Sequence, residues 1–345
     1  MEQENSLPRH ILIIRLSAIG DVAMLPHAIR AFRATYPDTK ITVATQRFLQ
    51  PFFKGLDVDF CNIDTKGEHR DFKGLMRFVG QIRTMGIDAI ADMHGVIRSY
   101  EIDTLARLVG IRIATIQKGR VEKWFRLGYS KSDAVPLKHT VVRYCDVLRR
   151  LGFDFADPMP IEQKPHYENP LGKKEGKWVG FAPFSAHAGK TYLEELREEV
   201  VQLLSERYNR VFIHSGGGDA ELSFAKDMEQ KYGNVTAVFP LLRLDKEIAL
   251  IAHLDCIVSM DSMAMHIASL VATPVVSIWG ATHPEFGFSG FGAPADTMLQ
   301  VEMPCRPCSV YGKKPCKYGD YRCLRAITPQ MIVEKVEILT QKQLN

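Results

Sequence analysis

The sequence predicts an α/β protein with two doubly wound domains. Three observations lead to this prediction: buried-strand patterns alternate with amphipathic helical patterns, a proline-rich stretch interrupts the alternation, and the alternation then restarts. Alternating strands and helices imply parallel sheets that are covered by helices on both faces. A chain of 345 residues is also too long for one ordinary core. We therefore expect two Rossmann-like domains.

The first half shows the alternation along its whole length. The run HILIIRL at residues 10–16 predicts a buried strand. A helical spacing of three and four is followed by Phe72, Leu75, Met76, Val79 and Ile82. Further strands are expected at residues 41–45, 58–63, 87–91 and 111–116, and helices at residues 22–35, 72–85, 101–109 and 139–151.

Prolines and Lys-Gly pairs interrupt the pattern between residues 157 and 177, which is typical of a linker. We place the linker at residues 161–176, between domains at residues 1–160 and 177–327. In the second domain, strands are expected at residues 178–182, 211–214, 235–239, 256–259 and 275–279, and helices at residues 193–208, 220–232, 245–253 and 263–271. A last helix within residues 328–345 starts with Thr328 as N-cap and Pro329 at its first position. Packing back onto the N-terminal domain is one arrangement open to this helix.

Composition bears on location and partners. No segment reaches the roughly 18 uninterrupted apolar residues of a membrane span. The polar start at residues 1–9 lacks the basic and apolar regions of a signal peptide, so we expect a cytoplasmic protein. A net charge of +4 is modest, and we expect no nucleic-acid partner.

Basic and aromatic side chains nevertheless gather in one segment. They are Lys118, Arg120, Lys123, Trp124, Phe125, Arg126, Tyr129 and Lys131. One interpretation is a solvated helix face. The other is a patch for anionic lipid headgroups or a phosphorylated glycolipid, which would hold the protein peripherally on the inner membrane.

The first motif that can carry chemistry is RLSAIGD at residues 15–21, between the first strand and the first helix. Gly20 permits a tight backbone turn and close approach of a ligand. Asp21 stands at the helix start, where aspartate is a favoured N-cap. A carboxylate at this strand end could instead act as general base for an acceptor hydroxyl. Both interpretations of Asp21 stay open.

The second motif is FSAHAGKT at residues 184–191, after the first strand of the second half. It nearly spells a P-loop, but Phe184 stands where the first glycine is required. A short polar loop remains, which presents Ser185 and Lys190 beside a strand end. A lysine ammonium there can neutralise a diphosphate leaving group. An exposed surface lysine is the alternative.

Two further motifs also follow strands. In DSMAMH at residues 261–266, the N–H groups and positive dipole end of a helix make a natural diphosphate site. Ser262 can cap this helix, and His266 lies one turn further along, within reach of a phosphate unless it is structural. In HSGGGDAE at residues 214–221, the glycines let the backbone close on a ligand. Asp219 or Glu221 could accept hydrogen bonds from ribose, although Glu221 stands where a GxGxxG motif has its third glycine.

Cysteines crowd near the C-terminus. One CxxC pair and two further thiols are enough for tetrahedral zinc, at Cys305, Cys308, Cys316 and Cys323. Reduced cysteines in a packed loop are a second interpretation, and disulfides formed on oxidation are a third. A cytoplasmic location argues against stable disulfides.

Taken together, these motifs resemble glycosyltransferase family nine, the ADP-heptose:lipopolysaccharide heptosyltransferases. The most specific parts are RLSAIGD and the run DSMAMHIASLVATPVVSIWGATHP, and the resemblance extends from His10 to the C-terminal helix. It implies a GT-B fold, in which two Rossmann-like domains face a central cleft. It also implies an ADP-activated sugar donor, with ADP-heptose expected, inversion at the anomeric carbon, a lipopolysaccharide-type glycolipid acceptor and no required catalytic metal.

The resemblance assigns roles to particular residues. Asp21 is the expected catalytic base. The donor diphosphate is expected at Ser185, Lys190, Ser262, Met263, Ala264, Met265 and His266. The donor ribose and base are expected at Asp219, Glu221 and Asp261, and the acceptor at Ser17, Gly20, His94 and Arg98. Met263 departs from the family, which often has glycine there, and makes this turn bulkier.

Other classes fit the residues less well. A nucleotide hydrolase would need a complete P-loop, which Phe184 spoils. A nicotinamide dehydrogenase would need GxGxxG after the first strand, where this chain has SAIGD. A zinc-dependent nucleic-acid module would leave both α/β halves unexplained. A transferase of the same fold that uses another nucleotide sugar remains an alternative.

Overall fold

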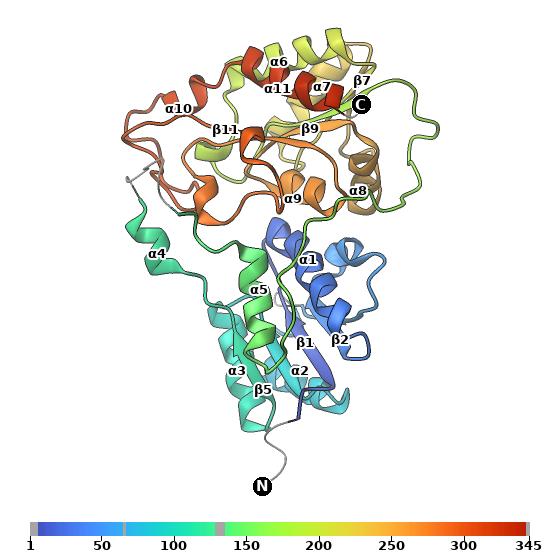
Figure 1. The fold of residues 1–345 in the computed structure, drawn as a ribbon, viewed down its shortest axis with the longest axis vertical. Helices are drawn as coiled ribbons and strands as arrows, with labels where there is room; N and C mark the ends of the chain where they lie inside the picture. Colours follow the sequence, from blue (N-terminus) through green and yellow to red (C-terminus); the bar gives the residue numbers. More distant parts are fainter. Residues whose placement is uncertain (1–5, 65–66, 128–134, 343–345) are drawn as a thin grey trace. The chain divides into compact units, whose positions relative to one another are not determined.

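The chain folds into two compact α/β units. The computed structural model describes residues 6–64, 67–127 and 135–342. Unit 1 comprises Met1–Lys118 and Thr140–Met159, and unit 2 comprises Gly119–His139 and Pro160–Asn345. Each unit is built on one parallel sheet with helices packed against it (Figure 1). The predicted fold class of two doubly wound α/β halves is confirmed.

Unit 1 holds a parallel sheet in the order β3-β2-β1-β4-β5. Its strands are β1 (His10–Ile14), β2 (Lys40–Thr45), β3 (Asp59–Asn62), β4 (Ala89–Asp92) and β5 (Arg112–Thr115). Its helices are α1 (Ile19–Thr35), α2 (Phe72–Thr84), α3 (Ile97–Leu108) and α5 (Thr140–Arg149), with a 3₁₀ segment η1 (Arg47–Phe53). The strand order reverses between β1 and β4. Open α/β sheets bind ligands at such a reversal, beyond the carboxyl ends of the strands.

Unit 2 holds a parallel sheet in the order β11-β10-β9-β6-β7-β8. Its strands are β6 (Trp178–Ala182), β7 (Arg210–Ile213), β8 (Val235–Ala237), β9 (Cys256–Met260), β10 (Val275–Ile278) and β11 (Met298–Leu299). Its longer helices are α6 (Glu194–Arg207), α7 (Asp219–Lys231), α8 (Leu244–His253), α9 (Met263–Leu270) and α11 (Pro329–Lys342). Its shorter elements are α4 (Arg120–Phe125), α10 (Arg322–Arg325), η2 (Ala188–Lys190), η3 (Pro284–Phe286) and η4 (Ala295–Thr297). Here the order reverses between β6 and β9.

The buried strands follow directly from the apolar runs. All residues of β1, β6 and β9 are buried, as expected for central strands of a sheet that is covered on both faces. Helix α2 buries one stripe, which consists of Gly74, Leu75, Phe78, Val79 and Ile82. Phe72 and Met76, which belong to the predicted apolar pattern, lie outside that stripe and are 63% and 55% exposed.

Two segments belong to unit 2 in a way that the sequence did not predict. Residues 119–127 and 135–139 were expected in the first domain, but they contact unit 2. Nζ of Lys123 lies 4.1 Å from the ring centroid of Phe288, and the N–H of Leu137 donates to the carbonyl of Glu285 at 2.8 Å. Helix α11 packs on α6 and β9, and its residues Ile332, Val333 and Val336 join the core of unit 2. The expected N-cap of α11 is present, since Oγ1 of Thr328 accepts the N–H of Met331 at 3.3 Å.

Ile332→Ala tests how far the core of unit 2 depends on α11. Ile332 is fully buried, so we expect the free energy of unfolding to fall by about 2–5 kcal/mol, because the lost apolar contacts leave a cavity. Denaturant unfolding followed by circular dichroism measures this change. The matched control is Ile338→Ala on the same helix, where the side chain is 44% exposed and a change within about 0.5 kcal/mol is expected. Equal losses at both positions would contradict the packing of α11 described above.

Candidate active site

A carboxylate stands at the switch point of unit 1, where β1 leads into α1. Asp21 lies in the first turn of α1 and forms an ion pair with Arg15, whose side chain is buried. The Arg15 guanidinium also donates to the carbonyl of Met93 at 2.6 Å, and Oδ2 of Asp21 accepts the N–H of Ala18 at 3.3 Å. The hydroxyl of Tyr144 donates to the carbonyl of Asp21 at 3.1 Å. The Asp21 side chain is 28% exposed, so it is oriented by the protein and still open to a ligand.

The start of α1 differs from the prediction. The helix begins at Ile19 with Ala18 as N-cap, so Asp21 is its third residue and the N-cap interpretation is wrong. The carboxylate still satisfies a backbone donor, because it accepts the N–H of the cap residue. Gly20 lies within the helical turn and has no left-handed backbone, so the expected tight turn at Gly20 is wrong as well.

Arg15 contacts the candidate base Asp21, and the sequence prediction did not single it out. Burial lowers the pKa of Arg15, but the charges of Asp21 and Tyr144 more than offset this, and the pKa is raised above its ordinary value. The guanidinium therefore stays charged beneath the carboxylate. The sequence did contain a pattern that could have indicated Arg15: a basic residue at the end of an otherwise apolar strand, shortly before an aspartate.

The loop after β4 lies beside the Asp21 loop, because β1 and β4 are paired with Ile14 opposite Asp92. Asp92 is fully buried and holds this loop in place. Its Oδ1 accepts the N–H groups of His94 and Gly95 at 2.8 and 3.0 Å, and its Oδ2 accepts the hydroxyl of Ser99 at 2.7 Å. Asp92 is thus a positioning residue that the sequence prediction did not single out.

His94 is in the predicted acceptor loop but does not carry the charge that would bind a phosphate. Burial, together with the positive charges of Arg15 and Lys118, lowers the pKa of His94 to about 4. Its Nδ1 accepts the N–H of Leu16 at 3.4 Å. At neutral pH the imidazole is therefore uncharged, and it links the two loops of this strand edge.

Ser17 and Arg98 complete the acceptor residues that the sequence predicted. Ser17 is exposed in the loop between β1 and α1. Arg98 lies in the first turn of α3 and forms an ion pair with Glu101 at 3.1 Å, with its side chain 32% exposed. Ser17 thus lies in the loop after β1, and Arg98 lies in the helix that follows the loop after β4.

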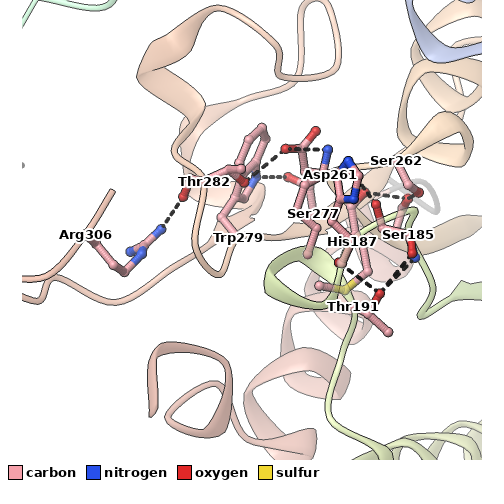
Figure 2. Close-up of polar contacts among 12 residues, drawn as sticks. Ser185, His187, Thr191, Asp261, Ser262, Ser277, Trp279, Thr282 and Arg306 are labelled. Carbon is pink, nitrogen blue, oxygen red and sulfur yellow. Dashed lines mark hydrogen bonds and ion pairs between the residues drawn. The ribbon is translucent and has the colours of Figure 1, made fainter. Parts of the chain in front are cut away.

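In unit 2, the loops after β6 and β9 are neighbours, and their polar side chains form one network (Figure 2). Nζ of Lys190 lies 3.0 Å from Oδ2 of Asp261, and the Thr282 hydroxyl donates to the same oxygen at 3.0 Å. The Ser185 hydroxyl donates to the carbonyl of Asp261 at 3.4 Å. Oγ1 of Thr191 accepts the N–H of Ser185 at 3.2 Å and donates to its carbonyl at 3.1 Å.

This network changes the interpretation of two residues. Lys190 is not a solvated surface lysine, because its side chain is 16% exposed and paired with Asp261. Asp261 itself is buried and binds Lys190 and Thr282 through its carboxylate. The structure thus pairs Asp261 with Lys190, and the ribose contact that the sequence suggested stays a prediction.

The start of α9 lies at the same strand edge. Ser262 is its N-cap residue, but its hydroxyl pairs with the hydroxyl of Ser259 at 3.2 Å and makes no capping hydrogen bond. The first N–H groups of a helix have no intrahelical acceptor, so those of Met263, Ala264 and Met265 are available to an anion. The side chain of Met265 is fully buried, which leaves only its N–H for this purpose. His266 is also buried, at 6% exposure.

The glycine loop after β7 is held by one of the two predicted ribose contacts. Oε2 of Glu221 accepts the N–H of Gly216 at 2.5 Å, so this carboxylate stabilises the loop backbone. Gly217 has a φ of +91°, a left-handed backbone conformation that favours glycine. Asp219 is the exposed first residue of α7 and is the carboxylate that remains open to a ribose.

The four C-terminal cysteines, Cys305, Cys308, Cys316 and Cys323, lie in the segment between β11 and α10 and at the start of α10. All four are described by the structure, and no three His, Cys, Asp or Glu side chains among the described residues are grouped so that they could hold a metal ion. The four thiols are free. Structural zinc and reduced cysteines in a packed loop both remain predictions for this segment.

The basic and aromatic segment of the sequence forms α4 in part. Its exposed apolar side chains are Val121, Trp124 and Phe125, at 68%, 66% and 69% exposure. Tyr129 and Lys131 lie outside the described residues. None of the helices in the described part of the chain is long and apolar enough to cross a membrane.

Comparison with known proteins identifies the family and supports the fold described above. The sequence model of glycosyltransferase family 9 (heptosyltransferase) matches residues 75–319. The lipopolysaccharide core heptosyltransferase OpsX of Haemophilus influenzae is 22% identical over 284 residues, which cover 80% of this chain and 80% of that protein.

Two solved structures show the same fold over nearly the whole chain. The Escherichia coli ADP-heptose LPS heptosyltransferase II has a TM-score of 0.70 at 17% identity, covering 97% of this chain and 100% of that one. A family 9 glycosyltransferase of Veillonella parvula has a TM-score of 0.72 at 19% identity, covering 97% and 98%. The two α/β units therefore have the GT-B architecture that the resemblance implied. Because the family match spans most of the sequence, this chain belongs to glycosyltransferase family 9, the heptosyltransferases, and is a glycosyltransferase.

Proposed function

We propose that this glycosyltransferase moves heptose from ADP-heptose to a lipopolysaccharide core or related glycolipid acceptor, with inversion at the anomeric carbon. The observation that carries the proposal is the polar network at the switch point of unit 2. There the Lys190 ammonium and the N-terminus of α9 follow neighbouring strands, which suits an anionic diphosphate. Relatives named as heptosyltransferases support heptose as the sugar.

Unit 2 would bind the donor through charge and backbone. As the bond between the sugar and the diphosphate breaks, negative charge accumulates on the leaving ADP. The Lys190 ammonium has three N–H donors, so it can retain its contact with Asp261 while it binds a phosphate oxygen. Because the ammonium and the α9 N–H groups are already oriented, they stabilise this charge without rearrangement.

Unit 1 would activate the acceptor. The Asp21 carboxylate takes the proton of the acceptor hydroxyl while that oxygen forms its bond to the anomeric carbon. The bond from the anomeric carbon to the diphosphate oxygen breaks on the opposite face, and its electron pair leaves with ADP. Arg15 holds the carboxylate in one orientation during this step. These charges supply the stabilisation that a divalent cation provides in other transferases, so we propose that no metal is required for transfer.

Asp21→Asn tests the proposed base. The amide keeps the size of the carboxylate but cannot take the proton, so we expect transfer to fall by roughly 10²–10⁴-fold. The assay follows acceptor-dependent ADP release from ADP-heptose with purified lipopolysaccharide core acceptors. The control is Asp38→Asn, which changes an exposed carboxylate of unit 1 and should leave the rate unchanged. Full activity of the Asp21 variant would show that Asp21 is not the base and would leave it only structural contacts, with Arg15 and with the N–H of Ala18.

The same assay distinguishes the donors. If the wild-type protein releases no ADP from ADP-heptose but transfers sugar from another nucleotide, the heptose assignment fails and the same-fold alternative stands. Nucleotide hydrolysis that needs no acceptor would instead favour a hydrolase, for which the incomplete P-loop at Phe184 offers little support.

Lys190→Met tests the proposed diphosphate contact. Removal of one preorganised charge should lower kcat/KM for ADP-heptose by roughly 10²–10³-fold. Lys190→Arg keeps the charge and should retain part of the activity. Lys226→Met, an exposed lysine on α7, serves as the matched control. If the Lys190 and Lys226 variants behave alike, Lys190 does not contact the leaving group.

We also propose that α4 attaches the protein peripherally to the cytoplasmic face of the inner membrane. Val121, Trp124 and Phe125 are exposed together, and the exposed Arg120 precedes them on the same helix. Apolar and aromatic side chains beside a cation suit the boundary between lipid headgroups and acyl chains. An acceptor embedded in a membrane would then be close to the enzyme.

Vesicle binding tests this attachment. The double substitution Trp124→Ala with Phe125→Ala should lower sedimentation with phosphatidylglycerol vesicles several-fold, because it removes most of the exposed aromatic area. Binding to phosphatidylcholine vesicles should be weaker for all variants, and added salt should weaken the binding to phosphatidylglycerol. Phe72→Ala on α2, where the side chain is 63% exposed, is the control. Unchanged vesicle binding by the α4 variant would exclude α4 as the attachment.

A further inference from the structure

Arg306 is a buried cation in the cysteine-rich segment, which we define as residues 305–323. The proposed function does not explain the role of this arginine. Its side chain is 1% exposed. Its Nε donates to the carbonyl of Gly280 at 2.6 Å, and its Nη2 donates to the carbonyl of Thr282 at 3.0 Å. Its Nη1 donates to the carbonyl of Val301. One guanidinium thus joins the loop that follows β10 to the segment that follows β11.

The backbone of the cysteine-rich segment holds the same loop. The N–H groups of Cys308 and Ser309 both donate to the carbonyl of Ala281, at 3.1 and 3.2 Å. The N–H of Ala281 in turn donates to the carbonyl of Gly189 at 2.9 Å. Ala281 therefore connects the cysteine-rich segment to η2, the 3₁₀ turn that ends at Lys190.

Thr282 makes a second connection, through side chains. Its carbonyl accepts from Arg306, and its hydroxyl donates to the Asp261 oxygen that binds Lys190 (Figure 2). The position of the hydroxyl depends on the position of the backbone to which it is attached. Arg306 therefore constrains the carboxylate that orients Lys190.

Gly312, further along the cysteine-rich segment, lies against the stem of the same lysine. Its φ is +75°, and a Cβ at this position would lie 2.5 Å from Cγ of Lys190. Only glycine leaves room for the lysine stem here. The cysteine-rich segment thus contacts Lys190 directly and also constrains it through Ala281 and Thr282.

Packing alone does not account for an arginine at this position. Burial lowers the pKa of Arg306, which reflects the cost of a charge in the core. The acceptors described above are uncharged backbone carbonyls, and the side-chain amide oxygen of Gln300 accepts at 3.3 Å. A buried charge is weak evidence for stability. What a planar guanidinium provides here is a fixed geometry for several carbonyls at once.

We propose that Arg306 is a positioning residue for the donor diphosphate site. It holds residues 280–282 so that Thr282 and Asp261 keep the Lys190 ammonium where the leaving diphosphate binds. This inference rests on the proposed function, which supplies the diphosphate. It also gives the Cys305–Cys308 turn a role, namely the presentation of Arg306 to the loop after β10.

The test compares two ligands, ADP and adenosine, by titration calorimetry. Arg306→Met should raise the Kd for ADP about tenfold, as expected for residues coupled in one hydrogen-bond network. The Kd for adenosine, which lacks phosphates, should stay unchanged, because only the ammonium is displaced. A purely structural defect would weaken both ligands. Arg325→Met is the control. Arg325 is exposed, lies on α10 and pairs with Glu195 of α6, so this substitution should change neither the Kd for ADP nor the Kd for adenosine.

Thr282 provides a second variant in case Arg306→Met does not fold. Thr282→Val keeps the shape of the side chain but removes its hydroxyl, and it should weaken ADP without weakening adenosine. Thr282→Ser restores the hydroxyl and should restore ADP binding. In a Lys190→Met background, Arg306→Met should cause no further loss of ADP affinity, because both changes act on the same contact.

Several outcomes would overturn the inference. They are an unchanged ADP affinity in both the Arg306 and Thr282 variants, an equal loss for ADP and adenosine, and losses that simply add to that of Lys190→Met. Failure of the wild-type protein to bind ADP is a different result, because it contradicts the proposed function itself. Normal ADP binding by the wild-type protein together with unaffected variants contradicts only the role of Arg306.

Discussion

Parallel pairing between strands that are distant in the sequence is the constraint on which the candidate residues of each unit depend. Strand β1 pairs with β4, and β6 pairs with β9, with Ile14 opposite Asp92 and Ala182 opposite Ser259. Main-chain hydrogen bonds set this register, so the loops after paired strands leave the sheet at one edge. The proposed base and the Asp92 loop thereby meet in unit 1, and Lys190 meets the start of α9 in unit 2.

Each unit then holds one candidate side chain in place through an ion pair between a carboxylate and a cation. In unit 1 the cation orients the carboxylate, and in unit 2 the carboxylate orients the cation. In unit 1 the Arg15 cation is the more buried partner, and the Asp21 carboxylate is the more exposed one. In unit 2 the Asp261 carboxylate is the more buried partner, and the Lys190 ammonium is the more exposed one. The more exposed member is in each case the one proposed to meet substrate. A buried charge that is paired and hydrogen-bonded has a fixed geometry, which a reacting group requires.

Sequence patterns predicted the long elements well because burial on a sheet imposes a regular spacing of apolar residues. They failed at details that depend on single hydrogen bonds or on neighbours far along the chain. The start of α1 was misplaced, since Ala18 caps the helix without a side-chain signal. The neutrality of His94 follows from burial and from the charges of Arg15 and Lys118, which no local pattern reveals. Short elements such as β11, with two residues, carry no periodicity at all.

The sequence by itself determined the order of strands and helices, the two-unit architecture and the loops that carry polar residues, because these depend on local composition and period. It also contained Asp21, Lys190 and the start of α9 as candidates. Only the tertiary structure decided that Asp261 orients Lys190 and that the cysteine-rich segment supports the loop after β10. The physical reason is that ion pairs and buried hydrogen bonds join residues whose distance in space is set by sheet register and packing.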